Sequence, residues 1–302
     1  MNGFFNMYKP AGMSSAAVVA VLKRLTGEKR VGHAGTLDPA AAGVLPIMVG
    51  RATRLFDYLV DKQKEYVAVC SFGAATDTQD ATGTVTETGD RYPSMAEVAA
   101  ALPALTGEIR QKPSMYSAIK VGGKRLYALA RQGETAEVPE RTVRVDSIEL
   151  LGEEPDHGVR IRVACGRGTY IRTLCADLGN LCGCPAHMRS LERTRSGVFS
   201  SENALSLEEA KRLAEEGKLA ERMIGMDAAL THLRRMDVPD WMKRKVEAGA
   251  ALPLDGMPGE KPEEGEPVRI CLRGCFWGIG QRRENQLVWR AQIPPENGEE
   301  KR

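Results

Sequence analysis

Apolar side chains recur with a helical period in two segments of the chain. In the first segment they lie three or four positions apart, at Val18, Val21, Leu22 and Leu25. A serine at 14 or 15 can cap this helix, and Gly27 can end it in a left-handed conformation. In the second segment Thr169 precedes the same spacing, at Ile171, Leu174, Leu178 and Leu181. Both segments are predicted to be amphipathic helices, the second capped by Thr169.

Other segments follow the two-residue period of a β-strand. Residues 159–165 alternate apolar and polar positions, and residues 65–72 do so with Tyr66 on the more apolar face. A short apolar run at 4–8 also predicts a strand. The segment at 76–89 is rich in threonine, aspartate and glycine and predicts a turn or loop. Because strands and helices follow one another in mixed order, the pattern favours an α+β fold.

One apolar stretch, Val31–Pro46, shows neither period. It contains three glycines, two prolines, one histidine and a single acidic residue, Asp38. The stretch is too apolar for a solvated linker, so we expect an ordered loop folded into a pocket. Pro39 biases Asp38 toward an extended backbone, and a carboxylate on a rigid loop suits a nucleophile or a general base. A structural role stays open, since aspartate is common in glycine-rich turns.

The length of 302 residues suggests about two domains. The composition, 42% apolar and 27% charged, is that of a globular protein. The sequence pattern changes after residue 233. This change predicts a main body over 1–233 and a small β-rich unit over 234–294. Strands are predicted in that unit at 268–280 and 286–293. The polar tail at 295–302 is expected to be disordered.

The cysteine content bears on location and on metals. Seven cysteines occur in a chain that shows no secretory signal and no apolar run of about 18 residues. An odd number of cysteines without such a signal indicates reduced thiols in the cytoplasm. Cys182, Cys184 and His187 lack the spacing of a zinc knuckle, so no metal site is predicted.

Positive charge is concentrated in two segments, although the net charge is only +2. Residues 110–144 contain eight basic and three acidic residues, and residues 159–195 contain seven and two. A basic surface on one side of a protein favours binding of nucleic acid. Solvated helix and strand faces would explain the same charge.

The junction at 166–172 joins a predicted strand to a predicted helix. Backbone amides at a helix start, together with Arg167 and Arg172, attract a phosphate or a carboxylate. Arg172 can equally be a solvated residue of the first turn. Tyr66 and Tyr170 can stack on a nucleobase, or they can lie in the core, as most strand tyrosines do.

Six blocks of sequence carry these candidates in order along the chain. The most specific is Gly32-His33-Ala-Gly-Thr-Leu-Asp38-Pro39. The other blocks are Lys9–Ser15, Lys64–Tyr66, Pro113–Gly133, Gly168–Leu174 and Leu191–Phe199. Taken together, these blocks resemble the motifs of the TruB family, the bacterial tRNA pseudouridine-55 synthases.

The resemblance implies a pseudouridine-synthase fold with a mixed, mainly antiparallel central sheet flanked by helices. Residues 1–233 would form the catalytic domain, with an RNA-contacting insertion at about 110–133, and residues 234–294 a PUA-like module. The implied activity is isomerisation of uridine 55 in the T-loop of tRNA, by base flipping and covalent catalysis. No cofactor, metal or protein partner is implied, and a monomer is the default.

Roles for individual residues follow from the same resemblance. Asp38 is the expected nucleophile, Tyr66 is expected to stack on the target base, and Arg172 is expected to pair with Asp38. Four residues are assigned to substrate binding: His33, Tyr170, Leu191 and Lys9. The expected RNA contacts are basic: Lys120, Lys124, Arg125, Arg131 and Arg167.

Two other functions stay open on the sequence. The chain could be an RNA chaperone that remodels tRNA without chemistry, which the presence of Asp38, Tyr66 and Arg172 disfavours. It could also be a guide-RNA-dependent rRNA pseudouridine synthase, and the basic insertion at 110–133 favours the stand-alone enzyme instead.

Overall fold

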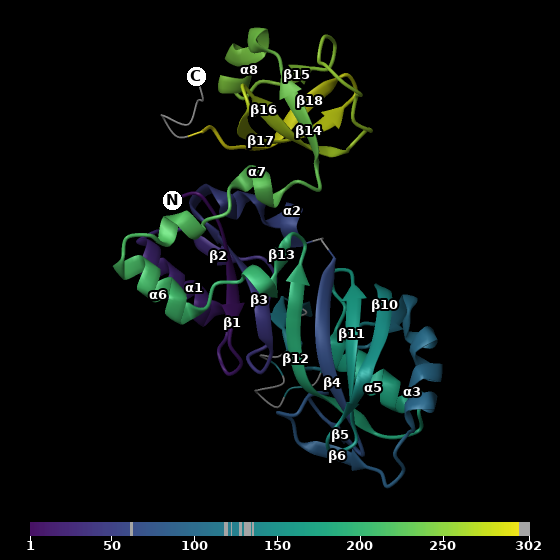
Figure 1. The fold of residues 1–302 in the computed structure, drawn as a ribbon. Helices are drawn as coiled ribbons and strands as arrows, with labels where there is room; N and C mark the ends of the chain where they lie inside the picture. Colours follow the sequence, from purple (N-terminus) through teal and green to yellow (C-terminus); the bar gives the residue numbers. More distant parts are fainter. Residues whose placement is uncertain are drawn as a thin grey trace.

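The chain forms two units, each built around a β-sheet (Figure 1). The computed structural model describes residues 1–60, 63–117, 120–121, 123–126, 129, 134 and 136–295. Within these residues the larger unit contains a nine-stranded sheet and the smaller unit a five-stranded sheet. The expected tail at 295–302 lies, apart from its first residue, outside the described residues.

The main path of the central sheet runs β1-β3-β12-β4-β11-β10-β7, and β2 and β13 pair with β3 and β12. All of these neighbours are antiparallel except β3 and β12, which are parallel. The mixed, mainly antiparallel sheet that the sequence predicted is therefore confirmed. The strands are β1 (Gly3–Lys9), β2 (Val31–His33), β3 (Ala42–Val49), β4 (Lys64–Phe72), β7 (Gly107–Gln111), β10 (Arg141–Glu154), β11 (Gly158–Cys165), β12 (Ala186–Ser196) and β13 (Phe199–Ser200).

Short helices flank the sheets. The α-helices are α1 (Ser15–Thr26), α2 (Phe56–Val60), α3 (Met95–Ala101), α5 (Ile171–Leu181), α6 (Leu207–Glu215), α7 (Met226–Ala229) and α8 (Lys243–Glu247). Short 3-10 helices are η1 (Gly50–Leu55), η2 (Leu102–Leu105), η3 (Ser201–Asn203), η4 (Leu219–Arg222) and η5 (Asp240–Met242). None of the helices in the described part of the chain is long and apolar enough to span a membrane.

The two predicted amphipathic helices are present, but one cap differs. In α1 the side chain of Ser14 accepts a hydrogen bond from Ala17 N, and Gly27 ends the helix with a φ of 68°. In α5 the N-cap position is Tyr170, so the prediction that Thr169 caps the helix is wrong. The hydroxyl of Thr169 instead donates to the carbonyl of Gly166 at 3.2 Å, which directs it back into the turn after β11.

Helices cover different parts of the central sheet. The side chains of α5 and α3 pack against β4, β10 and β11, and those of α1 and α6 pack against β1 and β3. The opposite face of β1 and β3 packs against Phe199 and against Ile279, Ala291 and Ile293 of the smaller unit. Strands β1 and β3 are consequently buried on both faces.

This burial corrects the prediction for Val31–Pro46, which is not a single loop. Its first residues form β2, and β3 begins at Ala42, so only residues 34–41 are irregular. A strand that is buried on both faces shows a continuous apolar run instead of an alternating one. Periodicity therefore could not reveal β3.

The smaller sheet has the strand order β14-β16-β17-β18-β15, and it confirms the β-rich C-terminal unit predicted from the sequence. Its strands are β14 (Arg234–Val238), β15 (Leu252–Pro253), β16 (Pro267–Leu272), β17 (Cys275–Arg283) and β18 (Gln286–Gln292). The single strand predicted at 268–280 is wrong, because Arg273 and Gly274 form a tight turn with φ values of 54° and 77°. Apolar residues on both sides concealed this turn.

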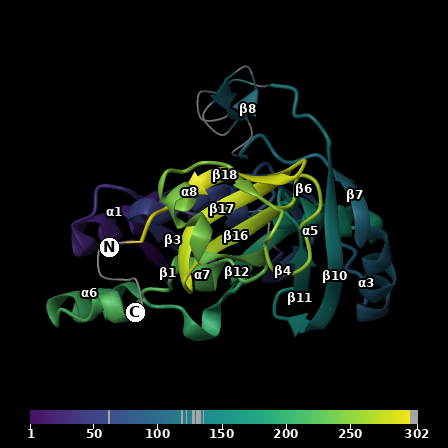
Figure 2. The ribbon, with the colours of Figure 1, turned by 90° about the horizontal axis from the view of Figure 1, so that it is seen from above.

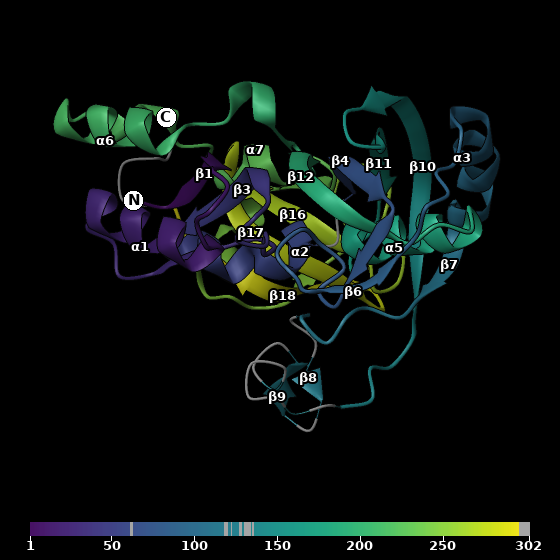
Figure 3. The ribbon, with the colours of Figure 1, turned by 90° about the horizontal axis from the view of Figure 1, so that it is seen from below.

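Two short hairpins extend from the larger unit. The first pairs β5 (Ala74–Thr76) with β6 (Val85–Thr88), so the segment at 76–89, predicted as a turn or loop, contributes to two strands. The second pairs β8 (Lys120–Val121) with β9 (Lys124–Arg125). Figures 2 and 3 show this second hairpin projecting from the body of the protein.

We expect Gly43→Ala to destabilise the fold by about 2–4 kcal/mol. Gly43 pairs with Arg193 where β3 meets β12. It has a φ of 109°, and a Cβ atom there would lie 2.3 Å from the Arg193 carbonyl oxygen. Urea denaturation followed by circular dichroism measures the loss. The control is Gly217→Ala, at a φ of 71° with no atom within 4 Å of the added Cβ, which should cost about 1 kcal/mol. Equal losses would contradict the close approach of the two strands.

Candidate active site

The loop between β2 and β3 carries Asp38 and is anchored to the start of the chain. The amide of Leu37 donates to Oγ of Ser15 at 2.9 Å, and that hydroxyl lies 3.0 Å from the Leu37 carbonyl, to which it donates. The amide of Gly12 donates to the carbonyl of Pro39 at 2.8 Å. These contacts hold the backbone on both sides of Asp38, so its carboxylate projects from a defined position.

Asp38 lines a cavity of about 560 Å³. The walls come from the Asp38 loop, β4, the β11–α5 junction and β12. The lining side chains with evident chemistry are Asp38, Lys64, Tyr66, Arg141, Arg167, Tyr170, Arg172, Leu191 and Arg193. The volume lies within the usual range for sites that bind small molecules. The cavity thus brings together all three residues predicted for catalysis, and Tyr170, Leu191 and Arg167 as well.

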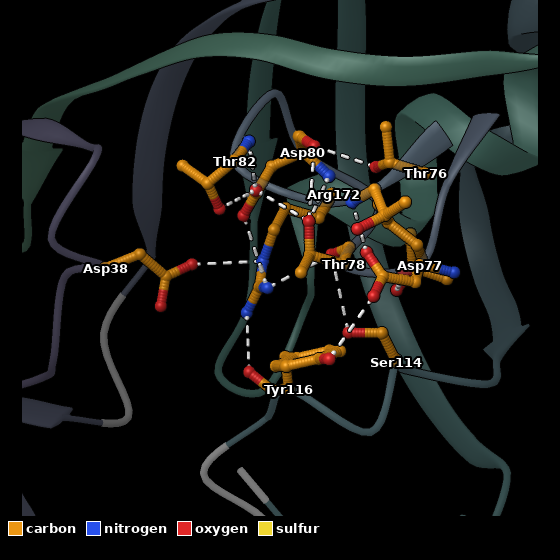
Figure 4. A network of polar contacts seen from close by, with 12 residues as sticks. Asp38, Thr76, Asp77, Thr78, Asp80, Thr82, Ser114, Tyr116 and Arg172 are labelled. Atoms are coloured by element: carbon orange, nitrogen blue, oxygen red, sulfur yellow. Dashed lines mark hydrogen bonds and ion pairs between the residues drawn. The ribbon is translucent and has the colours of Figure 1, made fainter. Parts of the chain in front are cut away.

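The guanidinium of Arg172 lies between two carboxylates (Figure 4). Its Nε is 3.0 Å from Oδ2 of Asp38, and its Nη1 is 3.4 Å from Oδ2 of Asp80. The remaining donors bind the carbonyls of Thr78 and Tyr116, each at 3.2 Å. Arg172 is 6% exposed. A buried arginine with this many partners has one orientation, because any other would leave donors unpaired.

Asp80 is itself held in place. Its Oδ1 accepts hydrogen bonds from Oγ1 of Thr78 at 2.8 Å, and from the amide of Thr82 at 3.0 Å and its Oγ1 at 2.5 Å. Asp80 was not among the predicted site residues, and it belongs to the segment predicted to be a turn or loop. The repeated threonine and aspartate residues of that segment were the available signal, since such side chains bond the backbone nearby.

Tyr66 lies on β4, opposite Arg193 of β12, and is buried. Burial raises the pKa of the Tyr66 phenol, and the nearby Arg193 guanidinium partly offsets this. Leu191 lies two residues before Arg193 on β12, where it packs against the main core. The ring of Tyr66 and the side chain of Leu191 therefore give the cavity an apolar portion beside its charged one.

Tyr170 stands at the start of α5. Its amide donates to Oε1 of Gln111 at 2.9 Å, and Nε2 of Gln111 donates to its carbonyl at 3.2 Å. The guanidinium carbon of Arg141 lies 5.8 Å from the centre of the Tyr170 ring. Burial raises the pKa of the Tyr170 phenol, and Arg141 opposes the effect. Gln111 of β7 thus fixes the backbone of a residue that lines the cavity.

Lys9 and His33 do not line the cavity. Lys9 is fully buried, and its Nζ donates to the carbonyls of Pro10 at 2.8 Å, Met13 at 2.7 Å and Pro39 at 3.2 Å. Burial lowers the pKa of the Lys9 amine to about 8. The structure thus places Lys9 behind the Asp38 loop, as an anchor of its backbone.

His33 is the last residue of β2, and burial lowers the pKa of its imidazole, as does nearby Arg193. Its buried Nδ1 has no hydrogen-bond partner among the residues that the structure describes. An unpaired buried nitrogen is costly. His33 therefore adjoins the site as a group that can still accept or donate one hydrogen bond.

The charge on the cavity wall is strongly positive. Lys64, Arg141, Arg167, Arg172 and Arg193 line it together with one carboxylate, that of Asp38. No role was predicted for Lys64, Arg141 or Arg193, because their side chains converge only in the folded protein. Such a wall suits a ligand that carries negative charge, such as the phosphates of a nucleic acid.

The predicted RNA contacts are distributed between the cavity and the projecting hairpin. Arg167 is exposed on the cavity wall. Lys120 lies in β8, and Lys124 and Arg125 lie in β9. Arg131 lies outside the described residues. Among the residues with described coordinates, no group of three or more histidine, cysteine, aspartate or glutamate side chains could hold a metal ion.

Two solved structures share this arrangement of elements. The structure of an H/ACA RNP bound to a substrate RNA containing 2′-deoxyuridine is 26% identical, with a TM-score of 0.76 over 98% of this chain and 86% of that chain. A Cbf5-Nop10-Gar1 complex is 28% identical, with a TM-score of 0.75 over 97% and 84%. These similarities confirm the predicted pseudouridine-synthase fold.

Sequence comparison identifies the family. A model of the N-terminal domain of TruB family pseudouridylate synthases matches residues 23–171, and a model of the tRNA pseudouridylate synthase B C-terminal domain matches residues 172–231. The tRNA pseudouridine synthase B of Bacillus licheniformis is 43% identical over 84% of each chain. That of Heliobacterium modesticaldum is 40% identical over 97% of this chain and 94% of its own. The chain belongs to the TruB family of pseudouridylate synthases.

Because Asp80 fixes Arg172, we expect Asp80→Asn to slow pseudouridine formation by about ten- to a hundredfold. The substitution keeps the shape of the side chain but removes one of the two negative charges around the guanidinium. A stability loss of about 1–3 kcal/mol should accompany it. Single-turnover rates and thermal denaturation measure the two effects. Asp90→Asn, an exposed aspartate directly after the segment at 76–89, is the control. An unchanged rate in Asp80→Asn would show that Arg172 needs only Asp38.

Proposed function

We propose that this protein isomerises uridine 55 in the T-loop of tRNA to pseudouridine, with Asp38 as the nucleophile. The observation that carries the proposal is the pairing of Asp38 with buried Arg172 at 3.0 Å, inside a cavity that Tyr66 also lines. The relatives named tRNA pseudouridine synthase B support tRNA as the substrate. The positive cavity wall is consistent with a polyanion.

The reaction must break the bond between N1 of uracil and C1′ of the ribose, turn the base and join C5 to C1′. C5 then loses its proton and N1 gains one, so the atoms balance. A base stacked within a folded loop cannot do this, so it must be flipped out, at a cost of a few kcal/mol. The ring of Tyr66 would offer the flipped base a new stacking surface, with Leu191 beside it. Arg172 would hold the Asp38 carboxylate in the orientation needed for attack on C1′ or on C6, and the geometry serves either route.

Uridine and pseudouridine are isomers, so the reaction consumes no electrons and transfers no group to another molecule. The residues of the cavity suffice for such a step. The proposal accordingly names no cofactor and no protein partner, and treats the chain as active alone.

Incubation of the purified protein with an unmodified tRNA transcript, followed by site-resolved detection of pseudouridine, tests the proposal. The parental protein should modify position 55. Asp38→Asn should fold and bind tRNA within about threefold of the parental affinity, yet react at least a thousandfold more slowly, because the amide is a poor nucleophile. Asp57→Asn, an exposed aspartate on α2, is the control. Formation of product by Asp38→Asn at the parental rate would refute the assignment of Asp38 as the nucleophile.

Two other functions predict different results in the same assay. The guide-RNA-dependent alternative draws support from the similarity to the H/ACA and Cbf5 structures. It predicts no product from the purified chain alone on a T-arm stem–loop. A chaperone without chemistry predicts no product from any variant, with equal tRNA folding by the parental protein and by Asp38→Asn.

The hairpin β8–β9 is proposed to grip RNA phosphates through Lys120, Lys124 and Arg125. Changing all three to glutamine should weaken tRNA binding. It should also make the slope of log Kd against log salt concentration shallower by about 2 to 3, because fewer counterions are released. The control changes Lys211, Arg212 and Lys218 to glutamine, in and just after α6, which lies away from the hairpin (Figures 2 and 3). Equal slopes for the parental protein and the hairpin variant would contradict the proposal that the hairpin contacts RNA.

A further inference from the structure

Arg193 of β12 is the largest fully buried side chain of the described residues and is 1% exposed. No carboxylate of the described chain lies within ion-pair distance of Arg193. The carboxylates of Asp38 and Glu65 pair with Arg172 and Arg195 instead. A buried guanidinium without an acidic partner is expensive unless its donors are all used. The hydrogen-bond partners of Arg193 therefore indicate which parts of the protein it holds in place.

Those hydrogen bonds go to the two ends of the Asp38 loop. Nε donates to the carbonyl of Val44 at 2.7 Å, Nη2 to that of Gly35 at 3.1 Å and Nη1 to that of Thr36 at 3.4 Å. Gly35 and Thr36 precede Asp38, and Val44 follows it. One rigid, planar group thus spans the loop that carries the proposed nucleophile.

The same guanidinium contacts the proposed stacking residue. Arg193 and Tyr66 are directly opposed in the β12–β4 pairing, and the guanidinium lies close enough to the Tyr66 phenol to lower its pKa. A guanidinium can only donate. In a hydrogen bond between the two groups the phenol oxygen accepts from Arg193, which leaves the phenol proton to point elsewhere.

We propose that Arg193 is a positioning residue that locks the Asp38 loop and the Tyr66 ring into one arrangement. The catalytic role of Arg193 in this inference rests on the proposed function. The contacts of Arg193 with the Asp38 loop do not depend on it. Tyr66 lies on β4, whereas Asp38 lies on the loop between β2 and β3. Arg193 is the group that touches both supports.

Electrostatics agrees with this geometry. The titratable groups that face the Tyr66 phenol are Arg193 from β12, Cys165 from β11 and Asp38 from its loop. Arg193 lowers the pKa of the phenol, whereas burial, Cys165 and Asp38 raise it. Loss of the guanidinium would leave the phenol oxygen without its donor in a buried site.

The test is Arg193→Lys, which keeps the positive charge but cannot bond three carbonyls and a phenol with one planar group. We expect the single-turnover rate to fall at least tenfold while the Kd for tRNA changes less than about threefold. The matched control is Arg269→Lys. Arg269 is also buried and bonds the carbonyl of Leu233 at 3.0 Å and Oδ1 of Asp227 at 2.8 Å, in the smaller unit. A parental rate in Arg193→Lys, or a loss no greater than that of Arg269→Lys at equal stability, would overturn the inference.

A spectroscopic readout separates positioning from general stability. In protein labelled with 3-fluorotyrosine, the resonance of Tyr66 is identified by its absence in Tyr66→Phe. In Arg193→Lys this resonance should shift and broaden because the ring loses its fixed hydrogen bond, while in Arg269→Lys it should not move. An unchanged Tyr66 resonance in folded Arg193→Lys would contradict the proposed contact.

The inference can still be tested if Arg193→Lys does not fold or if the parental protein is inactive. If Arg193→Lys does not fold, Tyr66→Phe decides, because it removes the accepting oxygen and leaves the loop contacts intact. A parental rate in Tyr66→Phe would then overturn the link to Tyr66, and a tenfold loss would support it. If the parental protein makes no pseudouridine, the proposed function fails, and the fluorine spectra of the free protein still test whether Arg193 fixes the ring.

Discussion

The site depends on one constraint, the burial of Arg172 between Asp38 and Asp80. A guanidinium removed from water must satisfy its donors inside the protein, and here two carboxylates and two backbone carbonyls do so. These partners come from the Asp38 loop, the β5–β6 segment and the chain before β8. The burial of one side chain therefore ties together three segments that are distant in sequence.

The supports of Asp38 follow the same logic. Lys9 and Arg193 are both fully buried cations, and both bond backbone carbonyls of the Asp38 loop or its edges. Ser15 adds a reciprocal pair of bonds to Leu37. A short irregular loop thus becomes as well defined as the sheet beside it. Such rigidity is what a nucleophile requires, because it avoids the cost of ordering the loop when substrate binds.

The sequence predicted those parts of the molecule whose signals are local. Helix α1 with Ser14 and Gly27, and strand β11 with its alternation, follow from spacing alone. Strand β10 was not predicted. Its pairing with β11 shifts register between Val145 and Ser147, which interrupts the alternation of apolar and polar residues. The resemblance found the cavity residues Asp38, Tyr66 and Arg172. The threonine and aspartate pattern around Asp80 was a local signal for a turn, but its contact with Arg172 was not visible in the sequence. The role of Arg193 could not be predicted either, since its contacts with the Asp38 loop and β3 form only in the folded protein.

The most direct test of the account is a crystal structure of the protein with a T-arm RNA that carries 5-fluorouridine at the target position. The account predicts the fluorinated base inside the cavity against the Tyr66 ring, with the Asp38 carboxylate at contact or bonding distance from the linkage between ribose and base. Arg172 should still bridge Asp38 and Asp80. A base bound outside the cavity, with Asp38 turned away from it and Arg172 engaged on RNA phosphate instead, would contradict the account.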